Sequence, residues 1–197
     1  MSEAKLISIT PDAMSLLKRA AGQCYQKEAS DAVIQHIIKA GHLSVLEHCY
    51  ATFEVTCSIT TLLQLTRHRH FSFTVQSSRG SELTSVYETG DDLIDHMTKH
   101  MMEVYHDKVA AGDRKKEDLA YMLPKAAEYK LVITGNFRAW FEYLPKRLCK
   151  RASKEHQELA QKIYQELVMA CPQVFGNVKP NCEHCNEKGV LTSECEI

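Results

Sequence analysis

The chain has 197 residues, of which 44% are hydrophobic and 25% are charged, with a formal net charge of −1. These values are typical of one globular domain with a sizeable core. A net charge so close to zero argues against non-specific nucleic-acid binding, so any anion site must be built locally. The N-terminal residues lack the apolar run of a secretion signal, and no stretch reaches the roughly 20 apolar residues of a membrane span. We therefore expect a cytoplasmic protein that does not bind membranes.

The first third of the chain predicts two helices. Thr10 and Pro11 have the cap and first-residue pattern of a helix start, which predicts a helix over residues 11–25. Ser30 is expected to cap a second helix with apolar residues on one face, and Gly41 to end it.

Two strand patterns lie among the helices that follow. Phe53, Val55 and Cys57 alternate with polar neighbours, which predicts a half-buried strand over residues 51–57. The later predicted elements are a helix over 60–66, an irregular strand or loop over 71–78, a long helix over 91–111, a short helix or turn over 117–122, a strand over 129–134, a helix from 135 that bends or stops near Pro145, and an amphipathic helix over 153–170. This order indicates an α+β single domain with a small antiparallel or mixed sheet flanked by helices. So few strands for so many helices suggest that other subunits cover part of the apolar surface.

The densest chemical signal is a basic turn after the predicted helix at 60–66. Arg67, His68 and Arg69 bring guanidinium groups suited to bidentate phosphate contacts, and Ser77 and Ser78 add hydroxyl donors. A short segment of this kind, taken alone, is more often a solvated basic turn than a binding site. Its interpretation therefore depends on what accompanies it in the chain.

The wider spacing of this segment resembles the flavin-dependent thymidylate synthase family. Arg-His-Arg, then seven residues, then Ser is that family's signature, and Arg67 to Ser77 matches it in spacing. The other matching parts are Gln64 and Arg79 on either side of the motif, residues 41–48 (Gly-His-x-Ser/Thr-x-x-Glu-His), residues 134–140 (Asn-x-Arg), Arg147, and residues 151–155. The resemblance thus covers roughly residues 40–175 in the right order.

The resemblance implies methylation of dUMP to dTMP, with methylenetetrahydrofolate as carbon donor and NADPH as reductant through FAD. It also implies a homotetramer whose active sites are built from several subunits. By the same resemblance, the catalytic residues are Arg67, His68, Arg69, Ser77 and Arg147; the flavin is held by Ser44, Glu47, Arg67, His68, Arg69, Asn136 and Arg138; and the nucleotide is bound by Gln64, Gln76, Ser77, Ser78, Arg79 and Arg147. No metal is expected at this site.

The residues themselves allow plainer interpretations of several of these positions. Asn136 and Arg138 lie at a predicted strand-to-helix junction, where free backbone N–H groups favour an anion. Asn136 standing alone would be an ordinary helix cap, and Arg147 standing alone would be a surface charge. Both interpretations stay open beside the functional ones.

Four positions depart from the family pattern. Val75 stands where the family usually has Glu or Gln, and it cannot make a polar contact. Ala120 stands where relatives carry an arginine that contacts the nucleotide; losing such a charge-assisted hydrogen bond costs about 1.5–3 kcal/mol. Gly80 replaces an aromatic residue, and Pro145 interrupts a helix that is regular in relatives. The flavin half of the site is therefore better kept than the nucleotide half.

The end of the chain predicts a separate tail. We expect a family-like domain over residues 1–175 and a cysteine-containing tail over 176–197. Cys182 and Cys185 have Cys-x-x-Cys spacing, which can hold zinc if ligands such as Cys195 converge on it. Reduced thiols are the more frequent outcome for a single pair of this kind, and a redox pair is a third alternative.

Two other classes of function compete with the enzyme. A catalytically altered relative would bind flavin or a pyrimidine nucleotide with a different substrate or a regulatory role, and Val75 and Ala120 motivate it. A nucleic-acid-binding module would use residues 67–70 and a zinc tail, but the near-neutral charge and the absence of a second basic stripe argue against it.

Overall fold

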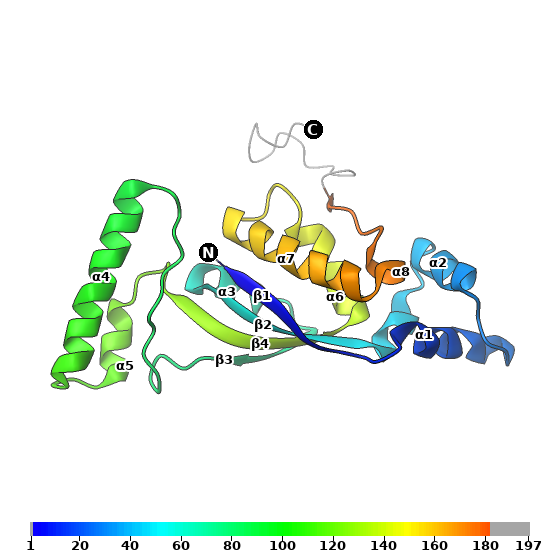
Figure 1. Ribbon diagram of the computed structural model, residues 1–197, viewed down its shortest axis with the longest axis horizontal. Coiled ribbons are helices and arrows are strands. Elements are labelled where there is room, and N and C mark those ends of the chain that lie inside the picture. Colours follow the sequence, from blue (N-terminus) through cyan, green and yellow to red (C-terminus); the bar gives the residue numbers. More distant parts are fainter. Residues whose placement is uncertain (1, 182–197) are drawn as a thin grey trace.

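The computed structural model describes residues 2–181, which form a four-stranded antiparallel sheet and the helices around it (Figure 1). The strands are β1 (Glu3–Ile9), β2 (Tyr50–Ser58), β3 (Phe71–Val75) and β4 (Glu128–Asn136), in the spatial order β1-β2-β4-β3. All three pairings are antiparallel. The predicted α+β domain with a small sheet is confirmed, and the sheet is antiparallel throughout.

The helices lie on one face and at both ends of the sheet (Figure 1). They are α1 (Ala13–Gly22), α2 (Asp31–Lys39), α3 (Ile59–Leu65), α4 (Asp92–Ala111), α5 (Lys116–Leu119), α6 (Phe137–Arg147), α7 (Lys154–Ala170) and α8 (Pro172–Phe175), with 3-10 turns η1 (Gln23–Tyr25), η2 (Leu43–His48) and η3 (Ala120–Met122). In Figure 1, α6 and α7 lie over the sheet, α1 and α2 stand at one end, and α4 and α5 stand at the other. None of the helices in the described range is both long and apolar enough to cross a membrane.

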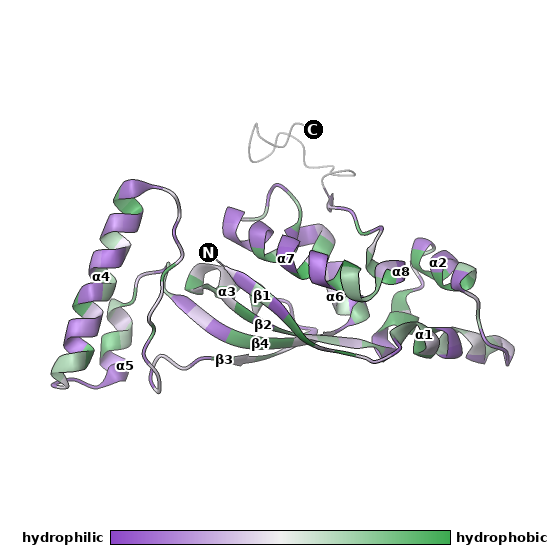
Figure 2. Cartoon of the chain, viewed as in Figure 1, coloured by the Kyte–Doolittle hydropathy of each residue, from purple (hydrophilic) through white to green (hydrophobic). Residues whose placement is uncertain are grey.

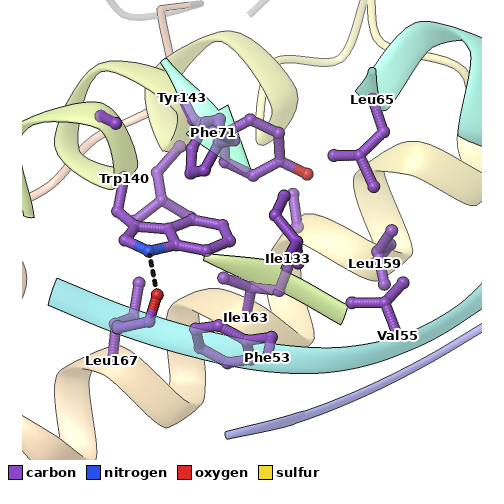
Figure 3. Close-up of a cluster of buried hydrophobic side chains, with 14 of the residues drawn as sticks. Phe53, Val55, Leu65, Phe71, Ile133, Trp140, Tyr143, Leu159, Ile163 and Leu167 are labelled. Atoms are coloured by element: carbon purple, nitrogen blue, oxygen red, sulfur yellow. Dashed lines mark hydrogen bonds between the residues drawn. The ribbon is translucent and has the colours of Figure 1, made fainter. Parts of the chain in front are cut away.

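The core lies between strands β2 and β4 and helices α6 and α7, which cover them. Phe53, Val55 and Cys57 are fully buried, as their alternation predicts. Trp140 of α6 packs edge-on against Phe53 and donates from its indole N–H to the carbonyl of Ala51, 3.1 Å away (Figure 3). A buried side chain of this size contributes about 1.5–3 kcal/mol, so this cluster fixes α6, and the residues it carries, over the sheet.

Strand β1 was not predicted, and the helix cap predicted at Thr10 is wrong. Thr10 joins β1 to β2, because its hydroxyl accepts from the Tyr50 amide at 2.8 Å and its own amide donates to the Tyr50 carbonyl at 2.9 Å. Helix α1 begins only at Ala13, after Asp12 in the left-handed region at a φ of 46°. The capping oxygen is thus occupied by strand pairing.

The other predicted helix boundaries are largely confirmed. Ser30 caps α2, and Gly41 follows that helix with a φ of +76°. The carboxylate of Asp91 caps α4 through the amides of Leu93 and Ile94, each at 3.0 Å. Helix α6 ends two residues after Pro145, near the predicted stop.

Helix α4 carries an apolar stripe with no partner in the described protomer. Leu93, Met97 and Met101 follow one another at four-residue spacing and share one face. Leu93 is 71% exposed and Met97 is 51% exposed. In Figure 2 the ribbon of α4 is mostly purple, interrupted by green segments of hydrophobic residues. The tail cysteines Cys182, Cys185 and Cys195 lie outside the described residues, so reduced thiols, a zinc site and a redox pair all stay open there. The division into a domain over 1–175 and a tail over 176–197 stays a prediction.

Candidate functional site

The basic motif forms a tight turn between α3 and β3. The amide of Arg67 donates to the carbonyl of Gln64 at 3.3 Å, and the amide of His68 donates to that of Leu65 at 3.1 Å. The turn closes where the amide of Phe71 donates to the His68 carbonyl at 3.3 Å. This backbone bonding continues the end of α3 and aligns the motif with the start of β3.

The turn faces α6 across an open cavity of about 260 Å³. Its charged and polar lining comes from both sides and consists of Arg67, His68, Arg69, His70, Glu142, Tyr143 and Lys146. Three cationic side chains around one cavity favour an anionic group. Pockets that enclose a cofactor measure about 300–1,000 Å³, so this cavity has room for part of a dinucleotide and needs further walls for the rest.

The side chain of His68 is held by a hydrogen bond and by two aromatic contacts. Its Nε2 accepts a hydrogen bond from Arg147 Nε at 3.0 Å. Its ring lies edge-on to those of Tyr143 and Phe71, with centroids 5.0 and 6.2 Å away. Burial, followed by the charges of Arg147 and Lys146, lowers the pKa of His68 to about 4. Because a guanidinium can only donate, the neutral ring carries its proton on Nδ1.

Beside the cavity, Arg138 connects two elements through carboxylates. Its Nη1 lies 2.6 Å from Glu47 Oε1, and its Nε lies 2.8 Å from Glu142 Oε1. Glu47 belongs to η2, whereas Arg138 and Glu142 are one turn apart on α6. The predicted pair Glu47 and Arg138 is thus brought together. Ser44 lies exposed on the same 3-10 turn as Glu47.

Asn136 serves as the N-cap of α6. Its Oδ1 accepts from the amide of Ala139 at 2.8 Å. Asn136 therefore does act as a helix cap, which was the plainer interpretation of this residue. The cap also sets the direction in which α6, the helix that carries Arg138 and Arg147, leaves β4.

The predicted nucleotide-binding residues fall into two groups. Gln64 and Arg147 lie at the motif turn, whereas Ser77, Ser78 and Arg79 follow the far end of β3. A strand of five residues separates its ends by roughly 15 Å. Within one protomer the two groups therefore lie at opposite ends of β3.

The side chain of Gln76 is already hydrogen-bonded to neighbouring residues of the same protomer. Its Nε2 donates to Ser81 Oγ at 3.1 Å and to the Glu82 carbonyl at 3.3 Å, and its Oε1 accepts from the Lys130 amide at 3.2 Å. Ser77 is similarly engaged, because its Oγ accepts from the Gly80 amide at 3.3 Å. These bonds shape the loop, and the nucleotide role of both residues stays a prediction.

Arg79 lines a second cavity, of about 460 Å³, together with Glu117, Asp118, Ala120 and Tyr121. Ala120 is the position at which the family pattern has an arginine, and the structure places it beside Arg79. Two carboxylates share this cavity with a single arginine. The local charge is therefore less favourable to a phosphate than the family pattern predicts.

Four residues of the motif cavity and its surroundings were missed from the sequence: Glu142, Tyr143, Lys146 and His156. Glu142 could have been found from its four-residue spacing to Arg138 on a helix. Tyr143 and His156 showed only the spacing of core residues, and their hydrogen bond at 3.0 Å joins two helices.

The comparison with protein families decides the relationship. The family model described as thymidylate synthase complementing protein matches residues 5–173. A flavin-dependent thymidylate synthase from Mycobacterium sp. (strain JLS) is 30% identical, and the aligned region covers 83% of this chain and 79% of that protein. The chain belongs to the flavin-dependent thymidylate synthase family. The predicted family and enzyme class are thereby confirmed.

Further members agree with this assignment. The flavin-dependent thymidylate synthase of Corynebacterium diphtheriae is 29% identical over 88% of this chain and 82% of its own length. A probable enzyme of the same name from Mycobacterium phage L5 is 27% identical over 85% of this chain and 81% of its own length. The crystal structure of Helicobacter pylori ThyX with FAD and dUMP superposes with a TM-score of 0.81 at 22% identity, covering 90% of this chain and 99% of that one. This last likeness establishes the shared fold.

Proposed function

We propose that this enzyme methylates dUMP to dTMP in the cytoplasm, taking the carbon from methylenetetrahydrofolate and the reducing equivalents from NADPH through FAD. The observation that carries the proposal is the Arg147–His68 contact of 3.0 Å at the rim of a cavity lined by Arg67 and Arg69. It joins the family motif to the arginine that the family pattern assigns to the nucleotide. The relatives' names and the ThyX complex with FAD and dUMP support the same reaction.

The flavin half of the site is supported by charge. Arg67, Arg69 and Lys146 surround the 260 Å³ cavity and are suited to the phosphates of FAD. Ser44, Glu47, Asn136 and Arg138 are the remaining flavin residues in this proposal. FAD supplies the electron transfer when bound, while the side chains hold and orient it. His68, neutral and protonated on Nδ1, offers one N–H donor to a ring oxygen or nitrogen.

The nucleotide half requires a second copy of the chain. Gln64 and Arg147 from one protomer and Ser77, Ser78 and Arg79 from another would form one site, because roughly 15 Å separates the two groups within a protomer. Ser77 also takes a catalytic role in this proposal. A homotetramer with shared sites accounts for this separation and for the exposed apolar stripe of α4.

The second candidate is a relative with an altered substrate or a regulatory role. Ala120 beside Arg79, with Glu117 and Asp118 in the same cavity, favours it. Val75, one residue before Gln76, has an apolar side chain and so offers the nucleotide no hydrogen bond. Both observations concern the nucleotide half alone, so this alternative keeps the flavin.

A tritium-release assay with 5-labelled dUMP separates these proposals. With FAD, NADPH and methylenetetrahydrofolate present, we expect release by the wild-type enzyme and a loss of about 10- to 100-fold in Arg67→Ala and Arg147→Ala, since each removes a charged contact worth about 1.5–3 kcal/mol. Arg114→Ala, in the loop after α4, is the matched control and is expected to keep full activity. A yellow, FAD-bound protein that releases no tritium would favour the altered relative, and full activity in both site variants would refute the residue assignment.

A further inference from the structure

A buried chain of hydrogen bonds lies behind the motif cavity and links α6, α7 and α3. Tyr143 Oη lies 3.0 Å from His156 Nε2, and His156 Nδ1 lies 3.4 Å from Gln64 Oε1. Tyr143 is 1% exposed and His156 is 0% exposed, whereas Gln64 is half-buried. The chain therefore runs from the core to the edge of the site, and each ring nitrogen of His156 has one partner.

The protonation of this chain follows from its surroundings. Burial, followed by the nearby Arg147 and His68, lowers the pKa of His156 to about 3, so the ring is neutral and carries one N–H. The buried hydroxyl of Tyr143 needs an acceptor for its proton, and in the described part of the chain the acceptor within reach is His156 Nε2. The remaining ring proton is then on Nδ1, and it is donated to Gln64 Oε1.

We propose that His156 is a positioning residue for the nucleotide, which holds the Gln64 carboxamide with its oxygen inward so that its N–H donors face the substrate. The inference rests on the proposed function, because it takes Gln64 as a nucleotide-binding residue. A carboxamide fixed in this way donates to an oxygen acceptor, either a phosphate oxygen or a pyrimidine carbonyl. It offers no acceptor to an amino group at the same place.

Fixing the amide matters because glutamine is ambiguous by itself. Its two ends are an acceptor and a donor of nearly equal shape, and a free side chain presents either one. Because the oxygen of Gln64 is bonded to the buried ring of His156, the orientation of the amide is set during folding. Less conformational entropy is then lost when the nucleotide binds. The effect belongs to substrate affinity more than to the chemical step.

The tautomer can be tested without any activity. In nitrogen-detected NMR of histidine-labelled protein, we expect His156 to show a protonated Nδ1 and an unprotonated Nε2 from pH 5 to pH 8. The signals are assigned by their loss in His156→Gln. Tyr143→Phe keeps the aromatic ring at position 143 and removes its hydroxyl donor. This change is expected to shift the Nε2 signal of His156 and to alter the proportions of the two His156 tautomers. A proton on Nε2 in the wild-type protein, or a ring that titrates near pH 6.5, would overturn the proposal even if the enzyme makes dTMP.

Binding measurements test the link to Gln64. We expect His156→Phe and Gln64→Ala each to raise the Kd and KM for dUMP about 5- to 10-fold, as the loss of one hydrogen bond does, with kcat changed less than about twofold. The double variant is expected to be no weaker than the more affected single one, because both changes remove the same contact. A second double-variant comparison uses Tyr143→Phe in place of His156→Phe, because that substitution keeps the packing.

Tyr87→Phe is the matched control. Tyr87 is also a buried tyrosine, and its hydroxyl donates to Glu158 of α7 at 3.4 Å. Neither residue lines the motif cavity, so the KM for dUMP is expected to stay unchanged. Additive effects of His156→Phe and Gln64→Ala would mean that His156 only supports the fold, and would overturn the inference. If wild-type protein binds no dUMP, the proposed function fails, whereas the NMR result stands or falls by itself.

Discussion

At the scale of single residues, the site depends on two histidines that their surroundings keep neutral. His68 is held by Arg147, and His156 is held by Tyr143 and Gln64. The motif allowed Arg67, His68, Arg69 and Arg147 to be predicted from the sequence, because their spacing is distinctive. The role of His156 could not be predicted, since it arises only when α7 packs over α6 and α3.

The depressed pKa values predict a dependence of stability on pH. The pKa of His68 is lowered to about 4 and that of His156 to about 3, from 6.5 in the unfolded chain. Below pH 6.5 the unfolded state binds more protons than the folded state, so the free energy of unfolding falls as the pH falls from 6.5 toward 3. Between pH 7 and pH 5, His156 alone should account for about 2 kcal/mol.

Urea unfolding across that pH range measures this effect. His156→Gln removes the titrating group, and is expected to give a flatter dependence between pH 7 and pH 5 than the wild-type protein. An equally steep dependence in the variant would show that other groups are responsible.

The cavity beside Arg79 predicts a gain of affinity. Ala120→Arg restores a charged donor where the family pattern has one, and should lower the Kd for dUMP by about tenfold, the value of one charge-assisted hydrogen bond. Isothermal titration of FAD-loaded protein measures it, with Ala110→Arg on the exposed side of α4 as control. Weaker binding in Ala120→Arg would indicate that Glu117 and Asp118 have adapted this cavity to a different ligand.

At the scale of elements, strand β1 is the main part of the fold that the sequence did not reveal. A bulge between Leu6 and Ser8 breaks the two-residue alternation, and it leaves Ile7 48% exposed. The strand is instead specified by contacts far along the chain. Ser2 Oγ donates to Glu155 Oε1 at 2.7 Å, and Lys162 Nζ donates to the Ser2 carbonyl at 2.5 Å.

Glu155 should therefore be a major stabilising residue. Its buried carboxylate accepts from Ser2 Oγ, from the amide and hydroxyl of Ser58, and from Thr61 Oγ1, which joins α7 to the residue before β1, to β2 and to α3. Glu155→Ala leaves several buried donors unpaired and is expected to cost about 3 kcal/mol, or roughly 6–12 °C in Tm. Glu166→Ala on the same helix is the control for scanning calorimetry. A change below about 2 °C in Glu155→Ala would contradict this account.

At the scale of the whole molecule, the two halves of the predicted site lie at opposite ends of β3. Sequence spacing predicts residues for each half but could not show that one protomer keeps them apart. In the proposed enzyme a neighbouring copy completes each site, and the exposed apolar stripe of α4 is the surface that we propose for packing between copies.

Met97→Glu tests the role of that stripe. A carboxylate between Leu93 and Met101 would be buried without a partner on assembly, so the proposed tetramer is expected to dissociate. His96→Glu, on the polar side of the same helix, should leave the assembly intact. Light scattering after size exclusion gives the mass of both variants, and an intact tetramer in Met97→Glu would place the interface elsewhere.

The most direct measurement follows the transferred carbon. Protein loaded with FAD is incubated with dUMP, NADPH and methylenetetrahydrofolate that carries carbon-13 in its methylene group, and the nucleotides are analysed by mass spectrometry. We expect the label in the 5-methyl group of dTMP, with no product when FAD or NADPH is left out. Flavin-loaded protein that binds dUMP but forms no labelled dTMP would contradict the proposed reaction.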